Sequence, residues 1–460
     1  MNIYILVEIS KREFDSNLLL AFLAALDGHE VVLSNFENYS FLNSISKLKP
    51  GVFHTKSILH GIKKKNFHES LKKKNFLITS IDEEASLINN DLTSFLETRF
   101  SSEALDLIDK VFCWGKHDYD SLKKKFPIHE EKFVLSGSPR MDLSKKLFQN
   151  FWSAEIKNLV DKNNILFALN FPVINGYIIK EKIFNEMKEQ GFFERSKTKE
   201  QEYLDYIEDS NKSFLSFKDL INYLSKELKN HKLIVRPHPM EKTETWKQLL
   251  QVNSNVEISN HNDINYDLGR SKILIHNGCS SAFQSALLDI PILSYKSYKA
   301  KSDYGILANQ LGKIISRKED IKNEIVKLTN DREIKLDYYI KKDILNLRIH
   351  HSNKSLSSEN ILNTWKNFSI HFKQKKNDWK IIKLNLQIFR LFKLIKEYSV
   401  RILKPFKKKT ENYYYRKKKF EELNIEDVRN KIYKFKKIFK KEEKIVVEKL
   451  SSKFFLIKKT

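Results

Sequence analysis

The chain has 460 residues, 41% of them hydrophobic, so it is long enough for two or three domains with substantial cores. Two cysteines, Cys113 and Cys279, exclude a disulfide framework or a cysteine-rich zinc site and favour a reducing cytoplasm. The formal net charge of +25 indicates an acidic partner, such as anionic lipid or nucleic acid.

The N-terminal half predicts an α/β unit. Ile3–Val7 and Glu30–Leu33 are short apolar runs typical of buried parallel strands, and between them Ser16–Leu26 predicts an amphipathic helix. The first run lacks the basic segment of a signal peptide, and no uncharged apolar stretch of about eighteen residues occurs, so we expect no membrane-spanning helix. Further strands are predicted at 76–80, 110–114, 133–135 and 165–169.

Three adjacent carboxylates, Asp82, Glu83 and Glu84, follow the strand predicted over Phe76–Ser80. Like charges this close raise the pKa of at least one carboxyl, which suits a general base. A solvated acidic cluster at the start of a helix has the same sequence pattern. In open α/β sheets the ligand crevice lies where the parallel strands end. By this strand-end argument we expect three further candidate site residues near the acidic triplet: Glu8, Arg12 and Arg140.

A D-x-D pattern, Asp118-Tyr119-Asp120, is typical of metal-dependent sugar transferases. Here it falls in a predicted surface helix after Gly115, which argues against a role as a metal site. We therefore expect neither a metal ion nor another cofactor.

A polar, helix-rich stretch over about 177–228 precedes a second predicted α/β unit. In that unit Lys232–Pro239, KLIVRPHP, predicts a strand that ends in Arg236 and His238. Arg236 can bind an anion through two hydrogen bonds, and His238 can donate a proton near neutral pH. Ligands bind at the carboxyl ends of the strands in open α/β sheets, so both residues are candidates for phosphate binding.

The segment Ile273–Tyr295, ILIHNGCSSAFQSALLDIPILSY, predicts a strand, a turn, a helix and a strand. Asn277 and Gly278 turn the chain, and Ser280 and Ser281 stand where a helix N-cap belongs. Such a turn directs N–H groups and hydroxyls to one spot beside the positive end of a helix dipole, which suits a phosphate. An ordinary capped βαβ turn has the same pattern.

The composition changes near residue 370. Residues 371–460 hold 29 Lys and Arg against 10 Asp and Glu, a net charge of +19 that leaves +6 for the first 370 residues. Leu384–Leu403 and Val428–Leu450 predict basic amphipathic helices of the kind that lie on anionic membranes. Solvated or partner-binding helices and a nucleic-acid surface are the alternatives. We expect the tail to be dispensable for nucleotide binding, because the candidate residues all precede residue 300.

Together these elements predict an α/β fold with three parts. The first is an N-terminal Rossmann-like domain over 1–172 that carries the acidic triplet. The second, over 173–370, is a Rossmann-like domain with the phosphate-binding candidates and the helical insertion at about 177–228; the resemblance described next implies that it is the nucleotide-sugar-binding domain. The third is a basic amphipathic helical tail over 371–460.

The chain resembles the bacterial surface carbohydrate biosynthesis proteins, which are similar to two-Rossmann-domain (GT-B) glycosyltransferases. The resemblance runs from Met1 to about residue 300 and leaves the tail outside it. Two departures are Ala85, where the family has Gly, and Gln284, where it has Glu. The landmarks, in chain order, are LVEISKRE, SIDEEA, VFCWG, GSPRMDL, RPHPME with Trp246, and IHNGCSSAFQSALLDIPILSY.

The His-Pro pair with a downstream serine turn also resembles transferases that use CMP-activated sugars, such as sialyl- and Kdo-transferases. A weaker likeness is to CDP-glycerol glycerophosphotransferases. These resemblances imply that Arg236, His238, Ser280 and Ser281 hold the nucleotide phosphate and that an N-terminal acid serves the acceptor or the sugar. Glu241, Asn277 and Gly278 are further candidates for binding the substrate or its nucleotide.

The implied function is a metal-independent glycosyltransferase of surface polysaccharide or lipopolysaccharide biosynthesis. It would take a nucleotide-activated sugar, CMP-linked, and a glycan or lipid-linked acceptor, at the inner face of the cytoplasmic membrane and against its anionic lipids; nucleic acid is not an expected partner. The alternatives on the same fold are a nucleotide-sugar epimerase or a CDP-glycerol-type glycerophosphotransferase. A non-catalytic component of a polysaccharide assembly complex is a further alternative.

Overall fold

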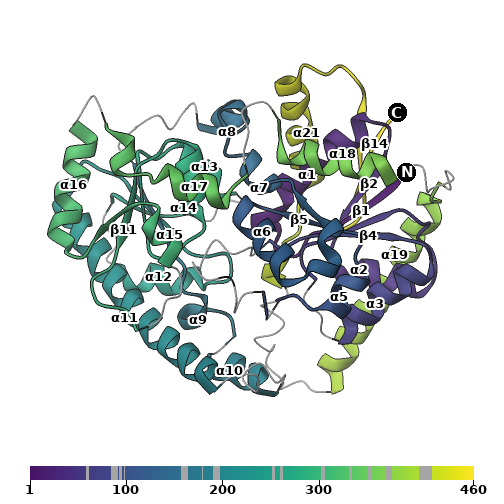
Figure 1. Cartoon of the computed structure of the whole chain (residues 1–460), viewed down its shortest axis with the longest axis horizontal. Coiled ribbons are helices and arrows are strands. Elements are labelled where there is room, and N and C mark those ends of the chain that lie inside the picture. Colours follow the sequence, from purple (N-terminus) through teal and green to yellow (C-terminus); the bar gives the residue numbers. More distant parts are fainter. Residues whose placement is uncertain are drawn as a thin grey trace. The chain divides into compact units, whose positions relative to one another are not determined.

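The computed structural model divides the chain into two compact units (Figure 1). The first unit comprises residues 1–85, 93–142 and 349–460, and the second comprises 86–92 and 143–348. The structure describes residues 1–58, 62–83, 92, 96–97, 99–156, 164–178, 180–189, 197–250, 254–259, 263–301, 306–330, 334–350, 355–368, 376–403 and 417–460.

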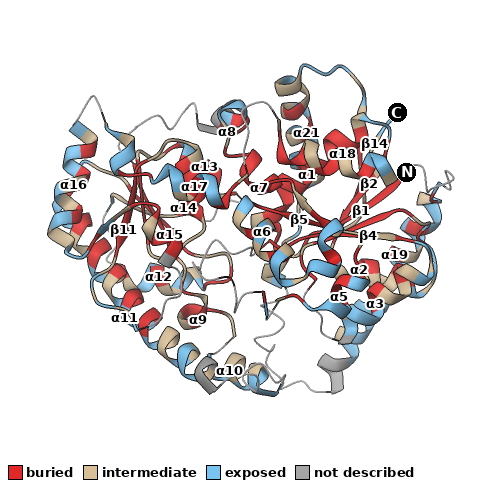
Figure 2. Cartoon of the chain, in the orientation of Figure 1, coloured by how far each residue is buried: buried red, intermediate tan, exposed pale blue. Residues whose placement is uncertain are grey.

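The first unit is built on a sheet in the order β13-β14-β2-β1-β3-β4-β5-β6. Its parallel strands are β1 (Asn2–Leu6), β2 (Glu30–Ser34), β3 (Val52–Thr55), β4 (Leu77–Ile81), β5 (Lys110–Cys113) and β6 (Phe133–Leu135). They are short apolar runs because helices cover both faces of the sheet, and Figure 2 shows them buried. The strand order reverses between β1 and β3, so the topological switch point lies there.

Helices pack around this sheet, and α1 is the most deeply buried of those described. It contacts α7, α18, α21 and β14. The carboxylate of Asp142 caps the start of α18 by accepting from the backbone N–H groups of Ser357 and Ser358, both at 2.8 Å. The helical elements are α1 (Ser10–Leu26), α2 (Phe36–Ser44), α3 (Ile62–Lys73), α5 (Ser102–Asp106), α6 (Lys116–Lys125), the 3-10 helix η1 (Pro127–Lys132), α7 (Pro139–Asp142), α18 (Ser357–Phe368), α19 (Trp379–Leu403) and α21 (Ile425–Phe439).

The basic tail is part of the first unit. Its two predicted helices are present as α19 and α21, but the second ends at Phe439. Residues beyond it form an antiparallel hairpin of β13 (Ile445–Ser451) and β14 (Phe454–Lys459), and β14 pairs with β2. The prediction of helix as far as Leu450 was therefore wrong, because the last residues complete a sheet instead.

The second unit contains a six-stranded sheet in the order β12-β11-β10-β7-β8-β9, with every pair parallel. Counted along the chain this is the Rossmann order 3-2-1-4-5-6, with its switch point between β7 and β10. The strands are β7 (Ile165–Ala168), β8 (Leu233–Arg236), β9 (Val256–Ile258), β10 (Ile273–His276), β11 (Ile292–Tyr295) and β12 (Lys313–Ile315).

The predicted helical stretch precedes β8 as α10 and α11, and α11 buries Phe217 and Ile221 in the core together with Trp246. Helices of this unit are η2 (Lys146–Phe148), α8 (Gln149–Ile156), α9 (Pro172–Asn175), α10 (Lys180–Glu189), α11 (Lys197–Glu227), α12 (Thr243–Leu249), α13 (Ile264–Gly269), α14 (Ser281–Leu287), α15 (Ile306–Gln310), α16 (Lys318–Asn330), η3 (Leu336–Tyr338) and α17 (Lys342–Arg348).

The units differ from the predicted domain boundaries at two places. The predicted first domain ran to residue 172, yet β7 lies within it in sequence and is a central strand of the second sheet. The predicted second domain ran to residue 370, yet the chain from Ile349 onward, with α18, belongs to the first unit. Among the described residues, no helix is long and apolar enough to span a membrane.

Candidate active site

The first cluster of site residues lies at the carboxyl edge of the first unit's parallel sheet and is called here the first-sheet edge. Glu8 follows β1, Lys56 follows β3, Asp82 and Glu83 follow β4, and Arg140 lies on α7 after β6. Lys56 Nζ is 2.6 Å from Glu8 Oε2, across the switch point between β1 and β3. The backbone N–H of Glu83 donates to the carbonyl oxygen of Lys56 at 3.0 Å, so the ends of β3 and β4 lie side by side at this edge.

Glu83 has the chemistry of a general base. Its side chain is only 4% exposed, and Oε2 accepts no hydrogen bond from the described part of the chain. Burial raises the pKa of this carboxyl to about 7; the positive charge of Arg140 opposes the shift and the negative charge of Glu13 adds to it. A carboxyl with such a pKa can take up a proton near neutral pH.

Arg140 faces Glu83, as the strand-end argument predicted. Its Nη1 donates to the carbonyl oxygen of Glu83 at 3.0 Å and lies 3.8 Å from Oε2. The guanidinium also lies over the ring of Trp114, 5.4 Å from its centroid. Arg140 is therefore held rigidly beside the carboxyl while forming no close ion pair with it.

The acidic triplet is not uniform. Asp82 accepts a short hydrogen bond of 2.6 Å from Arg99 Nε, and both side chains are largely buried. Glu83 has no comparable close charge partner among the described residues, and Glu84 lies outside them. The two described acids therefore differ, and Glu83 is the better candidate for proton transfer.

Glu8 and Arg12 are both held by neighbouring charges. Burial disfavours the charged form of Glu8, but Lys56 and Lys419 outweigh it and hold its pKa well below the usual range. Lys419 comes from the C-terminal tail and hydrogen-bonds Glu8 Oε1. Arg12 donates to Glu13 at 2.8 Å, and Glu13 also accepts from the N–H of Glu8 at 2.9 Å at the start of α1. Roles for Glu8 and Arg12 in substrate binding stay predictions.

Sequence reasoning missed several cationic residues at or near this edge. Lys64, on α3, donates to the carbonyl and hydroxyl of Ser57, at 2.6 and 2.9 Å. Burial, followed by the charge of Lys56, lowers the pKa of its ammonium to about 8. The missed residues are Lys56, Lys64, Arg99 and Lys419, and no local pattern marks them, since Lys is abundant throughout the chain.

The second cluster lies at the carboxyl edge of the second unit's sheet, and we call it the second-sheet edge. The loop after β7 is hydrogen-bonded to the loops that follow β10 and β8. Asn170 Nδ2 donates to the carbonyl of Gly278 at 3.1 Å, and the N–H of Phe171 donates to Glu241 at 2.9 Å. Because β7 lies between β8 and β10, the loop with His238 and the turn with Gly278 share one edge. The two segments therefore end at the same edge of the sheet, as predicted, but on strands that are separated by β7 and are not neighbours as the spacing suggested.

His238 is held in a defined orientation. Its Nδ1 accepts from the backbone N–H of Met240 at 3.2 Å, so the neutral ring carries its proton on Nε2. Its own backbone N–H donates to Glu241 at 3.0 Å. The loop therefore presents His238 as a donor through Nε2.

Glu241, predicted to bind the nucleotide, has another role in the structure. It is 2% exposed and accepts four hydrogen bonds. The donors are the N–H groups of Phe171 and His238, the Asn175 amide and the Trp246 indole. Burial raises the pKa of its carboxyl, while the hydrogen bonds oppose the shift. Its oxygens are thus engaged by the protein, and Glu241 is a positioning residue for the His-Pro loop.

Arg236 is also engaged by the protein. Its Nη1 lies 2.7 Å from Oδ2 of Asp267, which is fully buried and also pairs with Arg270. An anion-binding role for Arg236 would have to use the remainder of its guanidinium. The prediction that it binds a phosphate stays a prediction.

The turn after β10 is organised by amide and histidine side chains. Gly278 has a φ of +67°, and its N–H donates to Asn309, which in turn donates to Asn277 at 2.9 Å. His276 accepts from the N–H of Cys279, and burial lowers the pKa of its ring to about 3, so it stays neutral. Ser280 is the N-cap residue of α14, where a cap was predicted, but its side chain makes no cap hydrogen bond; Ser281 is the first residue of the helix. The two hydroxyls stay predicted phosphate contacts.

In the described ranges, no group of three His, Cys, Asp or Glu side chains is arranged to hold a metal ion. The D-x-D segment lies on α6, as predicted. There Asp120 pairs with Lys116 at 2.5 Å.

Comparison with known proteins supports the fold. No protein-family model matches the sequence, and no curated protein matches it significantly. A structure of the wall teichoic acid polymerase TagF soaked with CDPG has a TM-score of 0.51 at 14% identity, covering 80% of this chain and 88% of that one. A putative UDP-N-acetylglucosamine 2-epimerase from Listeria monocytogenes has a TM-score of 0.50 at 11% identity, covering 82% and 98%.

At these identities the likeness concerns the fold alone. The predicted fold class, α/β with two Rossmann-like domains of GT-B type and a helical C-terminal segment, is confirmed.

Proposed function

We propose that this protein is a transferase of surface polysaccharide biosynthesis that moves a sugar from a nucleotide-activated donor to a hydroxyl of a glycan or lipid-linked acceptor. The observation that carries the proposal is Glu83, a buried carboxyl with a pKa of about 7 that lies beside Arg140 after the carboxyl end of β4. Perturbed pKa values of this kind cluster at functional sites.

In the proposed reaction Glu83 accepts the proton of the acceptor hydroxyl as the bond to the sugar forms. If the reaction retains configuration, a carboxylate of the triplet would attack the sugar instead and form a covalent adduct. Asp82 and Glu84 stay candidates for that role. Arg140, which donates to the backbone carbonyl of Glu83, would hold this carboxyl in position for the proton transfer.

The proposed donor site is the second-sheet edge, at the switch point between β7 and β10. His238 would donate through Nε2 to the departing phosphate, since its Nδ1 already accepts from Met240. The turn at Asn277–Ser281 would contribute N–H groups and hydroxyls, and Arg236 would add positive charge. Both edges supply protons and positive charge from side chains, so the proposal requires no metal ion.

We propose a CMP-linked sugar as donor on the resemblance of the His-Pro and serine segments. Neither comparison structure described above is named as a CMP-sugar transferase, and each supports an alternative: a glycerophosphotransferase that uses CDP-glycerol, or a nucleotide-sugar epimerase. We further propose that the protein works at the inner face of the cytoplasmic membrane, where lipid-linked acceptors are assembled.

A thermal-shift series with CMP, CDP and UDP tests the donor class. A nucleotide at a hundred times its Kd stabilises the protein by about 2.7 kcal/mol through mass action, and only the correct nucleotide does so at low concentration. CMP should give the largest shift. CDP would favour the glycerophosphotransferase, and UDP with isomerisation of the donor alone would favour the epimerase. Failure of all three nucleotides would favour a non-catalytic component.

A further inference from the structure

Helix α19 exposes a continuous apolar stripe to solvent. Ile381, Leu384, Ile388, Leu391, Phe392, Leu394, Ile395 and Tyr398 are each between 42% and 67% exposed. They recur at intervals of three and four residues, so they share one face of the helix. Single exposed apolar residues are ordinary on a protein surface, but a stripe of eight on one helix indicates a binding surface.

The opposite face of α19 fixes the helix on the first unit. Ile382 and Leu386 are both 1% exposed, and Phe389 stacks on Phe41 of α2 with the ring centroids 4.1 Å apart. Trp379 donates to Glu30 at 3.1 Å, and Lys393 to Glu37 at 2.8 Å. The stripe therefore faces outward because the other side of the helix is already packed.

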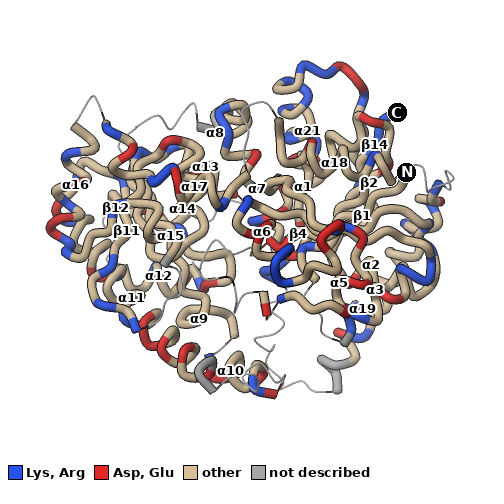
Figure 3. The backbone as a smooth tube through the Cα atoms, in the orientation of Figure 1, with Lys and Arg blue, Asp and Glu red and all other residues tan. Residues whose placement is uncertain are grey.

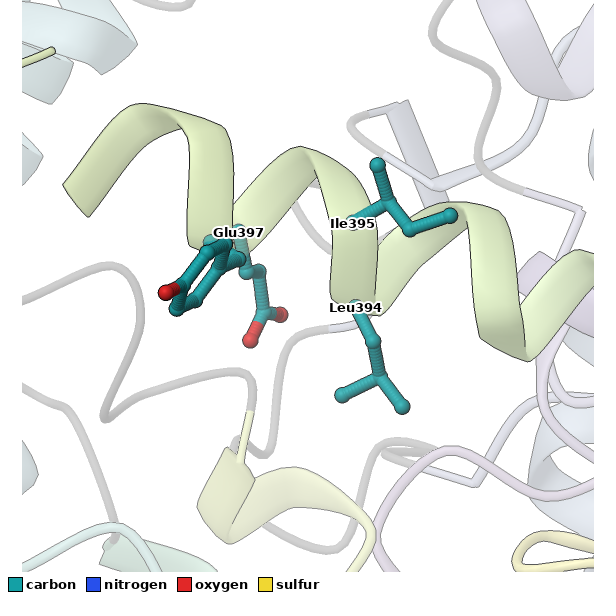
Figure 4. A pocket seen from close by; sticks show the side chains of 4 residues that line it. Leu394, Ile395 and Glu397 are labelled. Atoms are coloured by element: carbon teal, nitrogen blue, oxygen red, sulfur yellow. The ribbon is translucent and has the colours of Figure 1, made fainter. Parts of the chain in front are cut away.

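Near its C-terminal end the stripe is hollowed. Leu394, Ile395, Glu397 and Tyr398 line a pocket of about 380 Å³, and Figure 4 shows the side chains that line it. In that view Leu394 and Glu397 point to the same side of the helix.

The charge of α19 identifies the class of partner. Between Trp379 and Leu403 the helix carries six Lys or Arg and one Glu, so the helix with the apolar stripe is strongly basic; Figure 3 shows Lys and Arg positions along α19. Two copies of this helix pairing through the stripe would bring like charges together, which opposes association. An anionic lipid surface offers both an apolar layer and complementary charge.

The other tail helix does not share these features. On α21 the apolar residues Val428, Ile432 and Phe435 are buried, and Phe435 packs on Phe22 of α1 at 5.7 Å between centroids. The apolar face of α21 is therefore committed to the core of the first unit. The two basic amphipathic helices predicted from the sequence thus have different roles.

We propose that α19, and not α21, is the membrane-docking element of this protein, lying in the interface of an anionic bilayer with its apolar stripe inserted. This inference rests on the membrane location in the proposed function and is independent of the transfer chemistry. Tyr398 suits this position, since it is 65% exposed in the stripe and amphipathic aromatic rings prefer the headgroup level.

Vesicle sedimentation with the full-length chain tests the proposal. We expect binding to vesicles of phosphatidylcholine mixed with phosphatidylglycerol, little binding to phosphatidylcholine alone, and weaker binding as salt rises. The combined variant Leu391→Ser, Phe392→Ser and Ile395→Ser should bind at least about tenfold more weakly. Because these side chains are exposed, the melting temperature should stay close to that of the wild type.

Two matched controls separate α19 from general surface effects. The variant Lys383→Gln, Arg390→Gln and Lys396→Gln should weaken binding about tenfold, whereas Lys437→Gln, Lys441→Gln and Lys444→Gln, at and beyond the end of α21, should leave it within about twofold of wild type. Ile128→Ser and Tyr433→Ser, which remove exposed apolar groups elsewhere, should also bind normally.

Three results would overturn the proposal: wild-type affinity in the stripe variant, equal loss in the α21 control, or a wild-type protein that ignores anionic vesicles. Sedimentation velocity tests whether a second copy of the chain binds the stripe instead of a membrane. A dimer that the stripe substitutions dissociate would show this. Nucleotide-induced thermal shifts and transfer to a soluble glycan should persist in every stripe variant. A wild-type protein that shows neither nucleotide-induced thermal shifts nor transfer would count against the proposed function and not against docking.

Discussion

Arg140 Nη1 lies 3.8 Å from Glu83 Oε2 but hydrogen-bonds the backbone carbonyl of the same residue at 3.0 Å. The guanidinium thus fixes the backbone beside the carboxyl without forming a close pair with the carboxylate. Had the two groups formed a bidentate pair, the carboxyl would be held ionised and would be a poor base. In this geometry burial prevails over Arg140, and the pKa of Glu83 rises to about 7.

Glu83→Gln should lower the rate of transfer by about 10²- to 10⁴-fold, because the amide cannot accept the proton of the acceptor hydroxyl. For the wild type, kcat/KM should rise with pH through about 7 and then level off, since the base acts only when deprotonated. The variant should show no such rise. Initial rates measured from pH 5 to pH 9 check both statements.

The matched control for this variant is Asp82→Asn. It removes the charge partner of Arg99, so we expect a loss of stability of about 1.5–3 kcal/mol with the pH profile of transfer retained. Equal rates in wild type and Glu83→Gln would exclude Glu83 as the base. Loss of the pH dependence in Asp82→Asn alone would assign that role to Asp82.

Glu83 should also make the stability of the protein depend on pH. Its pKa is about 7 in the folded chain and ordinarily 4.5, so the folded state holds a proton that the unfolded state releases between these values. The contribution of this carboxyl to the free energy of unfolding is fully present below about pH 4.5, and it is lost as the pH rises through about 7. Glu83→Gln, which mimics the protonated carboxyl, should therefore melt above wild type at pH 8 and beside it at pH 4. Calorimetry at the two pH values is the measurement, and a constant difference would contradict the assignment.

His238→Ala should reduce transfer by about 10²- to 10³-fold, corresponding to about 2.7–4 kcal/mol for one group that stabilises the leaving phosphate. The circular dichroism spectrum should not change, because the side chain is only half-buried. His231→Ala, which alters a histidine just before the same strand, is the control and should transfer normally. Turnover of His238→Ala within threefold of wild type would remove this residue from the mechanism.

Glu241→Ala should act through stability and the position of the loop. The substitution removes the acceptor of the Trp246 indole and of the Phe171 and His238 N–H groups, and each such loss costs about 1–3 kcal/mol. Glu241→Gln keeps the shape but presents an amide nitrogen to some of these donors, so a smaller loss is expected. Urea titration followed by tryptophan fluorescence orders the three proteins. A Glu241→Ala variant as stable as wild type, with weak nucleotide binding, would restore Glu241 to the ligand site.

Most of the sheet framework could be predicted from the sequence, because apolar runs between turn residues mark buried parallel strands. β3 was missed since only two of its four residues, Val52 and Phe53, are strongly apolar. His54 is nevertheless buried there, with Nδ1 3.0 Å from Thr79 Oγ1, and burial lowers the pKa of its ring to about 3. Without β3, neither the switch point at Glu8 and Lys56 nor their ion pair could be expected.

The candidate site was predictable in part for the same reason. Strand-end reasoning correctly brought Glu83 together with Arg140, because every parallel strand ends at the same edge. Strand-end reasoning could not tell which charged residues would face a ligand and which would pair with other side chains of the protein. Arg236 and Glu241 follow a strand as a ligand-binding group would, yet their partners Asp267 and Trp246 are set by three-dimensional packing.

The C-terminal hairpin makes the end of the tail part of the first unit's sheet, and this has a consequence for experiments that truncate the chain. Leu456 of β14 is fully buried and pairs with Val32 of β2. Phe455 packs on Phe14, and Phe454 on Tyr39. Deleting residues 371–460 would expose the edge of β2 and this apolar surface of the first unit, while the expectation that nucleotide binding survives the deletion stays a prediction.

Leu456→Ser should therefore lower the free energy of unfolding by at least about 3 kcal/mol, since it opens a cavity and buries a hydroxyl in place of a leucine side chain. Lys459→Gln, at the exposed end of the same strand, should change it by less than about 0.5 kcal/mol. Urea titration of both variants is the measurement, and the chain truncated after residue 370 should be insoluble or unfolded in its first unit. A truncated chain with the cooperative transition and melting temperature of the full protein would show that β14 does not stabilise the sheet. Deletions of the tail could then be used to test membrane binding.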